Sequence, residues 1–390
     1  MSQTAGSPAA GAAAAAGSSS EGPAAAKPSA AEKLPRSISS LIFVRDRGII
    51  VLWILLILLF SIVAQPYFAS VGNAMLILNA GAITAIFAGA IAIGVFSGSL
   101  DLSVPGVAAF AGMVCAWMIT HGYPVWLCLA IGLAIGLAVG FVNARVTLMG
   151  LNPLVVTIGT LTILTGLAAV VGSGYTIPGL DSLAFMGTDT YFAITSSWTV
   201  VVEPWIILPD FSFQLGGFDG IPAPVFIMFG LFIIMTIFFT KTRGGIRLMA
   251  VGGNAEAVRR VGLSSTKYRT YGFMLSGLLA AIGGLVTIAY VGEASPQASP
   301  SIIFDGLTAV ALAGVSLAGG RGSLPKVLVG ALILATISDG LTIAGADPYW
   351  ATVTTGVLLV GALVADLLLT KTVSRRLVSV SNLSVHGKKA

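Results

Sequence analysis

Apolar runs dominate the chain from about residue 45 to its C-terminal region. A membrane-spanning helix takes about 20 such residues, and ten runs come near that length. They cover about residues 49–65, 74–95, 104–120, 125–146, 153–172, 222–240, 270–291, 302–319, 326–344 and 349–369. The pattern predicts an all-α fold, a polytopic membrane helical bundle of about ten transmembrane helices.

The two ends of the chain differ from this middle. Residues 1–38 are mostly Ala, Gly, Ser and Pro, with too little apolar surface to offset the entropy of ordering. We expect a disordered cytoplasmic tail at 1–40, a transmembrane domain at 41–375 and a short cytoplasmic tail at 376–390. A cleaved signal peptide is disfavoured because the first apolar run begins some 45 residues into the chain.

Composition excludes several classes of protein. Hydrophobic residues make up 56% of the chain and charged residues 9%, whereas soluble domains carry about 25% charged residues. Cys115 and Cys128 both lie in apolar runs, which argues against a disulfide-stapled domain and a cysteine-rich metal site. We expect no cofactor.

The basic residues fix an orientation. If the N-terminus is cytoplasmic and the ten spans alternate, all 20 Lys and Arg fall in cytoplasmic segments and the outer loops hold none. Because Lys and Arg in short loops set topology, both termini are expected in the cytoplasm. The net charge of +5 is then a matter of topology, and no nucleic-acid partner is implied.

The second half of the span pattern repeats the first. Spans beginning near 74, 104, 125 and 153 match spans beginning near 270, 302, 326 and 349, each offset by about 200 residues. Pro124 and Pro325 begin one equivalent pair, and Pro153 and Pro348 another. One span intervenes, so the second copy is expected in the opposite orientation, an inverted-type internal repeat as in many transporters. Coincidence among similar apolar lengths is the alternative.

The sequence lacks the motifs of nucleotide hydrolysis and of metalloproteases. There is no Gly-x-x-x-x-Gly-Lys-Ser/Thr and no His-Glu-x-x-His, and the two histidines are His121 and His386. A self-contained ATPase or metalloprotease is therefore not expected. Acids inside or at the edges of spans leave proton-coupled transport open as an alternative; the candidates are Asp101, Asp305 and Asp339.

Polar residues at membrane depth are candidates for lining a pathway. These are Asn79, Asp101, Ser103, Asn143, Thr157 and Thr160. A threonine in a helix often bonds a carbonyl of its own helix instead. Gly132, Gly136 and Gly140 form a stripe that predicts close helix packing. The segment Ser97–Gly106 interrupts apolar sequence and is either a capped loop or a broken helix at the pathway.

The basic segment 241–269 is predicted to contain a short helix over 254–262. Asn254 is a good N-cap, Glu256 suits the first turn, Arg259 the last turn, and Gly262 can end the helix. Val258 and Val261 are expected on one face. The segment is either a basic loop that sets topology or an element that docks onto a partner. The docking candidates are Gly253, Asn254, Glu256, Ala257, Val258, Arg259 and Gly262.

The outer segment 173–221 is long and contains five acids and no bases. Trp198, Trp205 and Phe211 are exposed apolar candidates for contact with a partner protein, since aromatic residues with a polar rim are typical of such patches. An amphipathic cover over the span ends is the alternative.

Three motifs together resemble a known family. Ser99-Leu100-Asp101-Leu102-Ser103-Val104, then Gly253-Asn254 with Ala257 and Gly262, then Gly319-Gly320-Arg321-Gly322-Ser323 are similar to the landmarks of bacterial ABC-importer permeases of the ribose, xylose and arabinose class. The resemblance runs from about residue 45 to 375. Pro105 stands where relatives usually have Gly, and the long outer segment and the N-terminal tail also depart from the pattern.

The resemblance implies a non-catalytic permease subunit in a bacterial inner membrane. It implies a homodimer of such subunits around one pathway for a small sugar, two cytoplasmic ATP-binding subunits, and an extracytoplasmic solute-binding protein. The short helix at 254–262 would couple the permease to ATP hydrolysis. An ABC permease for branched-chain amino acids or nucleosides, and a proton-coupled secondary carrier, are the alternatives.

Overall fold

The computed structural model describes residues 36–191, 198–201, 212–215, 220–316 and 319–386. The chain divides into two units, Met1–Ile42 and Phe43–Ala390. The described part of the first unit is the beginning of one helix, and the helices of the bundle belong to the second unit. The expected N-terminal tail lies outside the described residues as far as residue 35.

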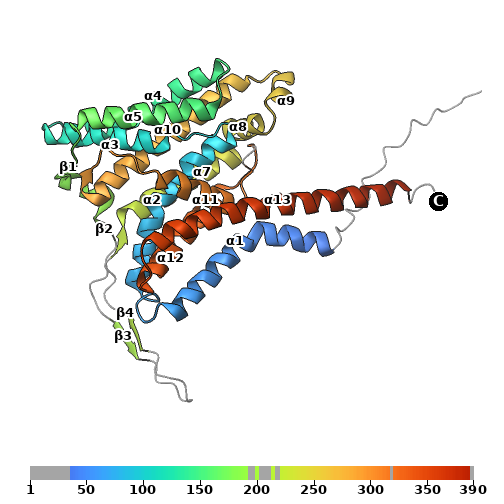
Figure 1. Cartoon of the computed structure of the whole chain (residues 1–390), viewed down its shortest axis with the longest axis horizontal. Coiled ribbons are helices and arrows are strands. Elements are labelled where there is room, and N and C mark those ends of the chain that lie inside the picture. Colours follow the sequence, from blue (N-terminus) through green and yellow to red (C-terminus); the bar gives the residue numbers. More distant parts are fainter. Residues whose placement is uncertain (1–35, 192–197, 202–211, 216–219, 317–318, 387–390) are drawn as a thin grey trace, which may run out of the picture. The chain divides into compact units, whose positions relative to one another are not determined.

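Each of the ten expected spans overlaps a helix (Figure 1). The helices are α1 (Arg36–Val63), α2 (Val71–Phe96), α3 (Val104–Thr120), α4 (Val125–Leu148), α5 (Pro153–Val171), α7 (Ala223–Lys241), α10 (Ser265–Val291), α11 (Ser301–Leu312), α12 (Leu324–Ile343) and α13 (Tyr349–His386). Six of them, α2, α4, α5, α7, α10 and α12, are long and apolar enough to cross a membrane. Four shorter apolar stretches lie in α1, α3, α11 and α13. The predicted all-α, polytopic fold is confirmed.

One expected span is wrong in its second half. The run at 302–319 was expected to be one helix, but α11 ends at Leu312. Its 12 residues span about 18 Å at 1.5 Å per residue, well short of a bilayer core of about 30 Å. Gly314 adopts a φ of 65°, a left-handed conformation that stops a helix. Apolar composition alone did not reveal this stop.

Side-chain caps explain several helix starts. The Ser70 hydroxyl accepts a hydrogen bond from the Asn73 backbone N–H at 3.1 Å, and α2 begins there. The Asn152 side chain accepts from Leu154 N–H at 2.9 Å, with Pro153 in the first turn of α5. Ser264 caps α10 through Lys267 N–H at 3.3 Å. These are the hydroxyl and amide residues that favour N-caps.

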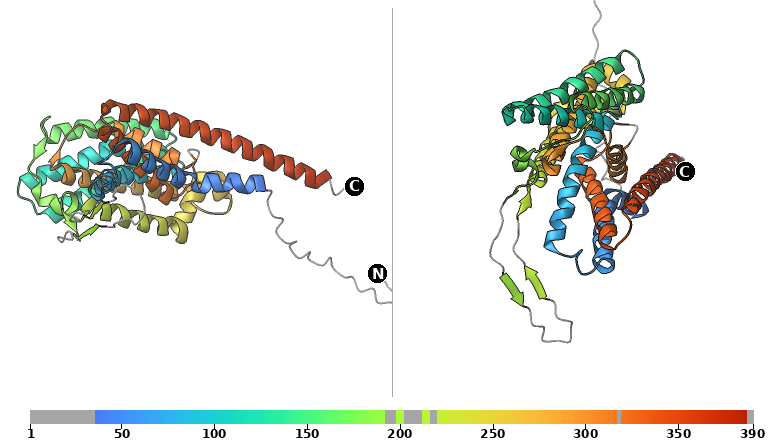
Figure 2. Two further views of the ribbon diagram at one scale, coloured as in Figure 1. Left: turned by 90° about the horizontal axis from the view of Figure 1, so that it is seen from below. Right: turned by 60° about the vertical axis from the view of Figure 1, so that its left-hand side comes forward.

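The helix packing repeats itself within the chain. α2 packs against α12, and α10 packs against α4; α3 packs on α10, and α11 packs on α2. Within each half, α3 contacts α4 and α5, as α11 contacts α12 and α13. If α2, α3, α4 and α5 exchange places with α10, α11, α12 and α13 in that order, the same helix pairs remain in contact. Figures 1 and 2 show these pairs side by side. This pattern is the one an internal repeat produces.

Small residues bring α4 and α10 together. A β-carbon on Gly136 would collide with the Gly277 carbonyl oxygen, and one on Gly140 would collide with the Phe273 carbonyl oxygen. A β-carbon on Gly132 would lie 3.1 Å from Leu285 Cδ2. The glycine stripe on α4 thus allows α10 to approach at backbone distance, as expected for helices in membranes.

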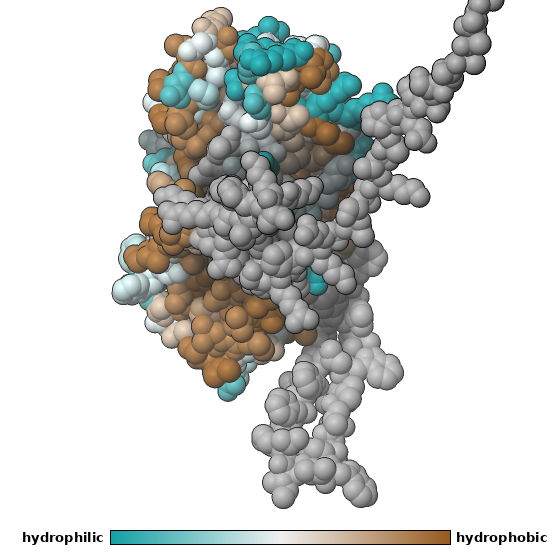
Figure 3. Space-filling view, turned by 90° about the vertical axis from the view of Figure 1, so that its right-hand side faces the viewer, coloured by the Kyte–Doolittle hydropathy of each residue, from teal (hydrophilic) through white to brown (hydrophobic). Residues whose placement is uncertain are grey.

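The outer faces of the bundle are apolar. Large hydrophobic side chains are exposed on α5, α7 and α13, for example Val155 at 69%, Ile233 at 58% and Val357 at 66%. Figure 3 shows hydrophobic surface over much of one face, with hydrophilic residues gathered toward one end. In contrast, most of α2 is buried. An apolar exterior around a packed interior is what lipid contact requires.

Part of the long segment 173–221 covers helix ends. Strand β1 (Ile177–Pro178) pairs antiparallel with β6 (Glu293–Ala294), and β2 (Thr190–Tyr191) with β5 (Ile221–Pro222). The short helices η1 (Asp181–Leu183) and α6 (Ala184–Gly187) lie between β1 and β2. Leu180 and Leu183 are buried in one cluster with Met113 of α3 and Ala289 of α10. Residues 177–191 therefore form a cover on these helices.

The remaining described part of this segment is the pair β3 (Trp198–Val201) and β4 (Ser212–Leu215). Trp198 lies in β3, whose side chains are not described. Trp205 and Phe211 lie outside the described residues. Their predicted role as contacts for a partner protein stays a prediction.

Candidate functional site

The second and third motifs of the resemblance meet in space, beside Gly98, which directly precedes the first motif. A helix that the sequence did not reveal, α8 (Arg243–Gly253), ends at Gly252 and Gly253. The turn after α2 brings Gly98 to them, and the segment after α11 brings Gly319 and Gly320. We call these five residues, Gly98, Gly252, Gly253, Gly319 and Gly320, the glycine junction.

Backbone packs on backbone throughout the glycine junction. A β-carbon on Gly252 would collide with the Phe96 carbonyl oxygen, and one on Gly98 would lie 3.0 Å from Gly252 Cα. A β-carbon on Gly320 would collide with Gly253. Gly320 also has a φ of 71°, which residues with a β-carbon rarely adopt. Only glycine fits at Gly98, Gly252 and Gly320, so the ends of α2 and α8 and the segment after α11 form one tight contact.

Asn254 joins two helices at this point. Its backbone N–H donates to the Ala250 carbonyl at 3.0 Å and ends α8, while its side-chain oxygen accepts from Ala257 N–H at 2.9 Å and begins α9 (Ala255–Arg260). The predicted N-cap is thus confirmed. Glu256 forms ion pairs with Arg259 and Arg260. These groups are exposed, so each pair contributes only about 0.2–1 kcal/mol.

The expected common face of Val258 and Val261 is wrong. Val258 is buried at 7% exposure, whereas Val261 is 73% exposed. The helix ends at Arg260, so Val261 lies beyond it and no longer follows the helical repeat. Gly262, with a φ of 81°, then turns the chain toward α10. The exposed surface of α9 therefore consists of Asn254, Glu256, Ala257, Arg259, Arg260 and the following Val261.

Helix α8 holds this segment to the bundle. Thr242 caps it by accepting from Gly245 N–H at 3.2 Å, and Leu248 and Val251 are buried. Arg247 Nη1 donates to the Tyr268 hydroxyl of α10 at 3.1 Å. The spacing of Leu248 and Val251 behind a threonine cap could have indicated this helix, but its four glycines obscured the pattern.

A buried hydrogen-bond network centres on Asp101. One carboxylate oxygen accepts from the Ser103 N–H at 3.0 Å and the Ser103 hydroxyl at 2.6 Å, and the other accepts from the Ser276 hydroxyl of α10 at 3.0 Å. Asn143 of α4 donates to the Ser103 hydroxyl at 2.9 Å. Thr160 of α5 lies 2.6 Å from the Asn143 side-chain oxygen, to which it donates. The loop between α2 and α3 is thereby tied to three further helices.

Four of the six predicted pathway residues belong to this Asp101 network. Asn79 lies on α2, outside this network, and its side-chain oxygen is buried without a hydrogen-bond partner. Thr157 is buried and bonds the Pro153 carbonyl of its own helix at 3.0 Å. In this conformation Asp101, Ser103, Asn143 and Thr160 face one another inside the subunit. Their role in lining a pathway stays a prediction.

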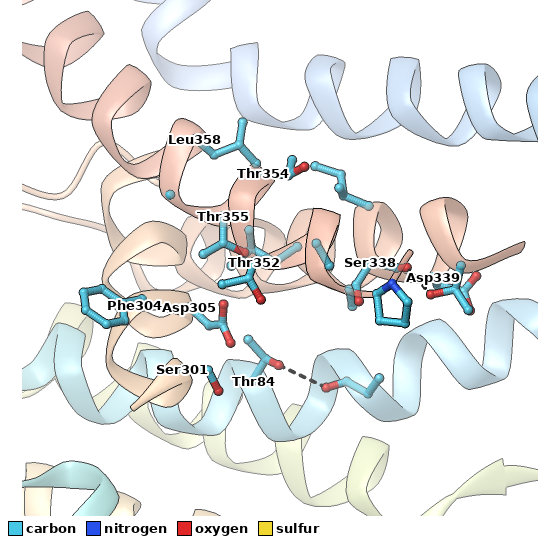
Figure 4. A pocket seen from close by; sticks show the side chains of 18 of the residues that line it. Thr84, Ser301, Phe304, Asp305, Ser338, Asp339, Thr352, Thr354, Thr355 and Leu358 are labelled. Carbon is cyan, nitrogen blue, oxygen red and sulfur yellow. Dashed lines mark hydrogen bonds between the residues drawn. The ribbon is translucent and has the colours of Figure 1, made fainter. Parts of the chain in front are cut away.

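A polar cavity lies outside this network. It has a volume of about 710 Å³, is lined by α2, α11, α12 and α13, and is open on one side (Figure 4). Its lining contains Asp305 of α11 and Asp339 of α12. The sequence identified both acids only as candidates for proton coupling. It did not reveal the cavity, because the hydroxyl residues around it are distributed over four helices.

The chain matches known proteins over most of its length. The family described as branched-chain amino acid transport system / permease component matches residues 73–363. The ribose import permease protein RbsC of Bacillus subtilis is 32% identical over 80% of this chain and 89% of its own length. The probable ABC transporter permease protein YphD of Escherichia coli is 32% identical over 85% and 92%.

A third relative, the L-arabinose transport system permease protein AraH of Escherichia coli, is 31% identical over 69% of this chain and 75% of its own length. No solved structure matches the chain. The family match covers the bundle from α2 into α13, including the glycine junction and the Asp101 network. The chain therefore belongs to the family of branched-chain amino acid transport system / permease components, a family of multi-pass membrane permeases.

Proposed function

We propose that this chain is the transmembrane permease subunit of an ATP-driven importer for a sugar or related polyol. The permeases of ribose and L-arabinose transport among its relatives support this substrate class. The chain carries no Gly-x-x-x-x-Gly-Lys-Ser/Thr sequence. ATP is hydrolysed by cytoplasmic partner subunits, and the permease itself is not catalytic.

The observation that carries the proposal is the link between α9 and the membrane helices. Helix α9 presents an exposed surface, and its N-cap Asn254 follows directly on the glycine junction. A movement of α9 is passed through backbone contact to the end of α2 and to the segment after α11. Rigid packed elements can transmit such a displacement because they deform little. A coupling element for an ATPase needs this connection, whereas a loop that only sets topology does not.

The proposed orientation follows the basic residues. Both termini and α8–α9 are cytoplasmic, and the chain resides in a bacterial inner membrane. Two copies of the chain form the pathway as a homodimer. An extracytoplasmic solute-binding protein delivers the sugar and contacts the outer segment 173–221, with Trp198, Trp205 and Phe211 as the candidate contacts.

Reconstitution tests the proposal directly. The full-length chain is placed in proteoliposomes together with its ATP-binding subunit and its solute-binding protein. We expect uptake of a radiolabelled neutral sugar that requires ATP and the binding protein, and that is lost when the ATPase carries a Walker-A lysine substitution. Uptake driven by a proton gradient without ATP would contradict the proposal.

A further inference from the structure

The cavity between α2, α11, α12 and α13 has the dimensions of a solute site. Its volume of about 710 Å³ lies within the range of about 300–1,000 Å³ that is usual for small-molecule pockets. Its walls carry hydroxyl groups from all four helices. These belong to Thr84, Ser301, Ser338, Thr342, Thr352, Thr354 and Thr355.

Charge in the cavity has one sign. Asp305 and Asp339 line it, and among the described lining residues there is neither Lys nor Arg. Asn73 donates to Asp339 Oδ2 at 2.8 Å, so that carboxylate is already engaged by α2. Asp305 lies apart from Asp339, at the end where Thr84, Ser301 and Thr355 gather (Figure 4). Such a cavity attracts hydroxyl donors and repels anions.

Apolar surface completes the lining. Phe304 is 54% exposed and Leu76 is 60% exposed, and both border the cavity. A sugar or polyol presents hydroxyl groups together with C–H surface, and therefore matches a wall of mixed character. An amino acid would bring a carboxylate, for which the described lining holds no positive partner.

We propose that this cavity is a transit site for a neutral polyhydroxylated solute, in which Asp305 accepts hydrogen bonds from the solute's hydroxyl groups. The inference rests on the proposed function, because it names the place in the subunit where the imported sugar binds. Asp305 positions the solute, and its substitution should impair uptake without affecting the contact between α9 and the ATPase.

Cysteine labelling tests whether the cavity is open to water. Ser338→Cys and Thr352→Cys place thiols on two walls, and Ile233→Cys on α7 is the control on an exposed apolar face. The native Cys115 and Cys128 are buried. In the assembled transporter we expect charged methanethiosulfonates to modify both cavity thiols but not Ile233→Cys. The cationic reagent should react about tenfold faster than the anionic one, and Asp305→Asn should reduce that ratio. Unreactive cavity thiols would overturn the proposal, because lipid or the second subunit would then fill the space.

Uptake tests the role of Asp305 itself. Proteoliposomes receive a mixture of radiolabelled D-ribose, D-xylose and L-arabinose. We expect Asp305→Asn to lower ATP-driven uptake at least tenfold while stimulation of ATP hydrolysis by the binding protein stays within twofold, and Asp305→Glu to retain part of the uptake. Unchanged uptake by Asp305→Asn beside an active wild type would overturn this inference alone. A wild type that imports none of the three sugars would instead contradict the proposed substrate class.

Discussion

The backbone of Gly253 lies against the backbone of Gly320, so the end of α8 touches the segment that follows α11. A β-carbon on Gly253 would lie 3.7 Å from Gly320 Cα, an ordinary contact, whereas one on Gly320 would collide with Gly253. The contact joins the second and third motifs of the resemblance through two residues that are more than 60 positions apart in the chain. It gives these motifs a shared physical role that their spacing in sequence does not suggest.

Substitutions at Gly252 and at Gly253, two adjacent residues of the glycine junction, should differ in their effect on ATP hydrolysis. Gly252→Ala forces a β-carbon into the Phe96 carbonyl oxygen, whereas Gly253→Ala meets nothing closer than 3.7 Å. We expect Gly252→Ala to lower binding-protein-stimulated ATP hydrolysis at least fivefold and Gly253→Ala to stay within twofold of wild type. The measurement is ATPase activity of the reconstituted transporter. Equal effects of the two substitutions would mean that close packing at Gly252 is not what matters.

The Asp101 network should contribute to stability. Ser276→Ala removes the donor to one oxygen of the buried Asp101 side chain, and leaving a buried acceptor without its partner costs about 1–3 kcal/mol. Thr162→Ala is the control, since Thr162 is exposed and bonds only the Ile158 carbonyl of its own helix. We expect a lower melting temperature in detergent for Ser276→Ala and no clear change for Thr162→Ala. Equal melting temperatures would show that the network is not stabilising.

Helix packing gives a matched pair of glycine substitutions. Gly140→Ala places a β-carbon against the Phe273 carbonyl oxygen of α10, whereas Gly159→Ala on α5 places it in open space. We expect Gly140→Ala to destabilise the protein. Gly159→Ala should be neutral or stabilising by up to about 1 kcal/mol, because alanine is the better helix former. Thermal unfolding of each detergent-solubilised variant, followed by tryptophan fluorescence, checks both expectations. A Gly140→Ala protein as stable as wild type would contradict the observed approach of α4 and α10.

Orientation can be read with single cysteines at two exposed positions. Tyr123, between α3 and α4, is 47% exposed, and Val261, after α9, is 73% exposed. The distribution of Lys and Arg predicts that the first lies outside and the second in the cytoplasm. An impermeant maleimide added to intact cells should label Tyr123→Cys, and Val261→Cys only after lysis. The reverse pattern would invert the topology.

The ten spans and the internal repeat were predictable because apolar length and proline position are local features of the sequence. The cap at Asn254 was predictable for the same reason. The end of α11 at Leu312 was not, because a glycine in an apolar run gives no sign of its φ. Neither the glycine junction nor the cavity around Asp305 could be predicted, because each depends on segments that are brought together only by the fold.

Among the candidate site residues, too, residue type was predictable from the sequence whereas the packing partners were not. Residue type correctly marked Asp101 and Asn143 as unusual in apolar sequence. Ser276, which donates to Asp101, was missed, since a single serine in an apolar helix carries no signal of its own. Val258 was marked as part of a docking surface, but the burial of its side chain means that it supports α9 from within. Whether a helical residue points inward depends on what packs against the helix.

Coupling through the exposed surface of α9 is the central claim, and one measurement tests it most directly. Binding-protein-stimulated ATP hydrolysis is compared for Ala257→Trp and for Arg259→Gln/Arg260→Gln in proteoliposomes. Ala257 is exposed on α9, so the tryptophan alters the shape of the surface without disturbing the buried Val258. We predict that Ala257→Trp abolishes the stimulation while basal hydrolysis persists, and that the double charge removal changes stimulation by less than twofold. Normal stimulation by Ala257→Trp together with loss in the charge variant would contradict the account and would identify the segment as a basic loop that acts through its charge alone.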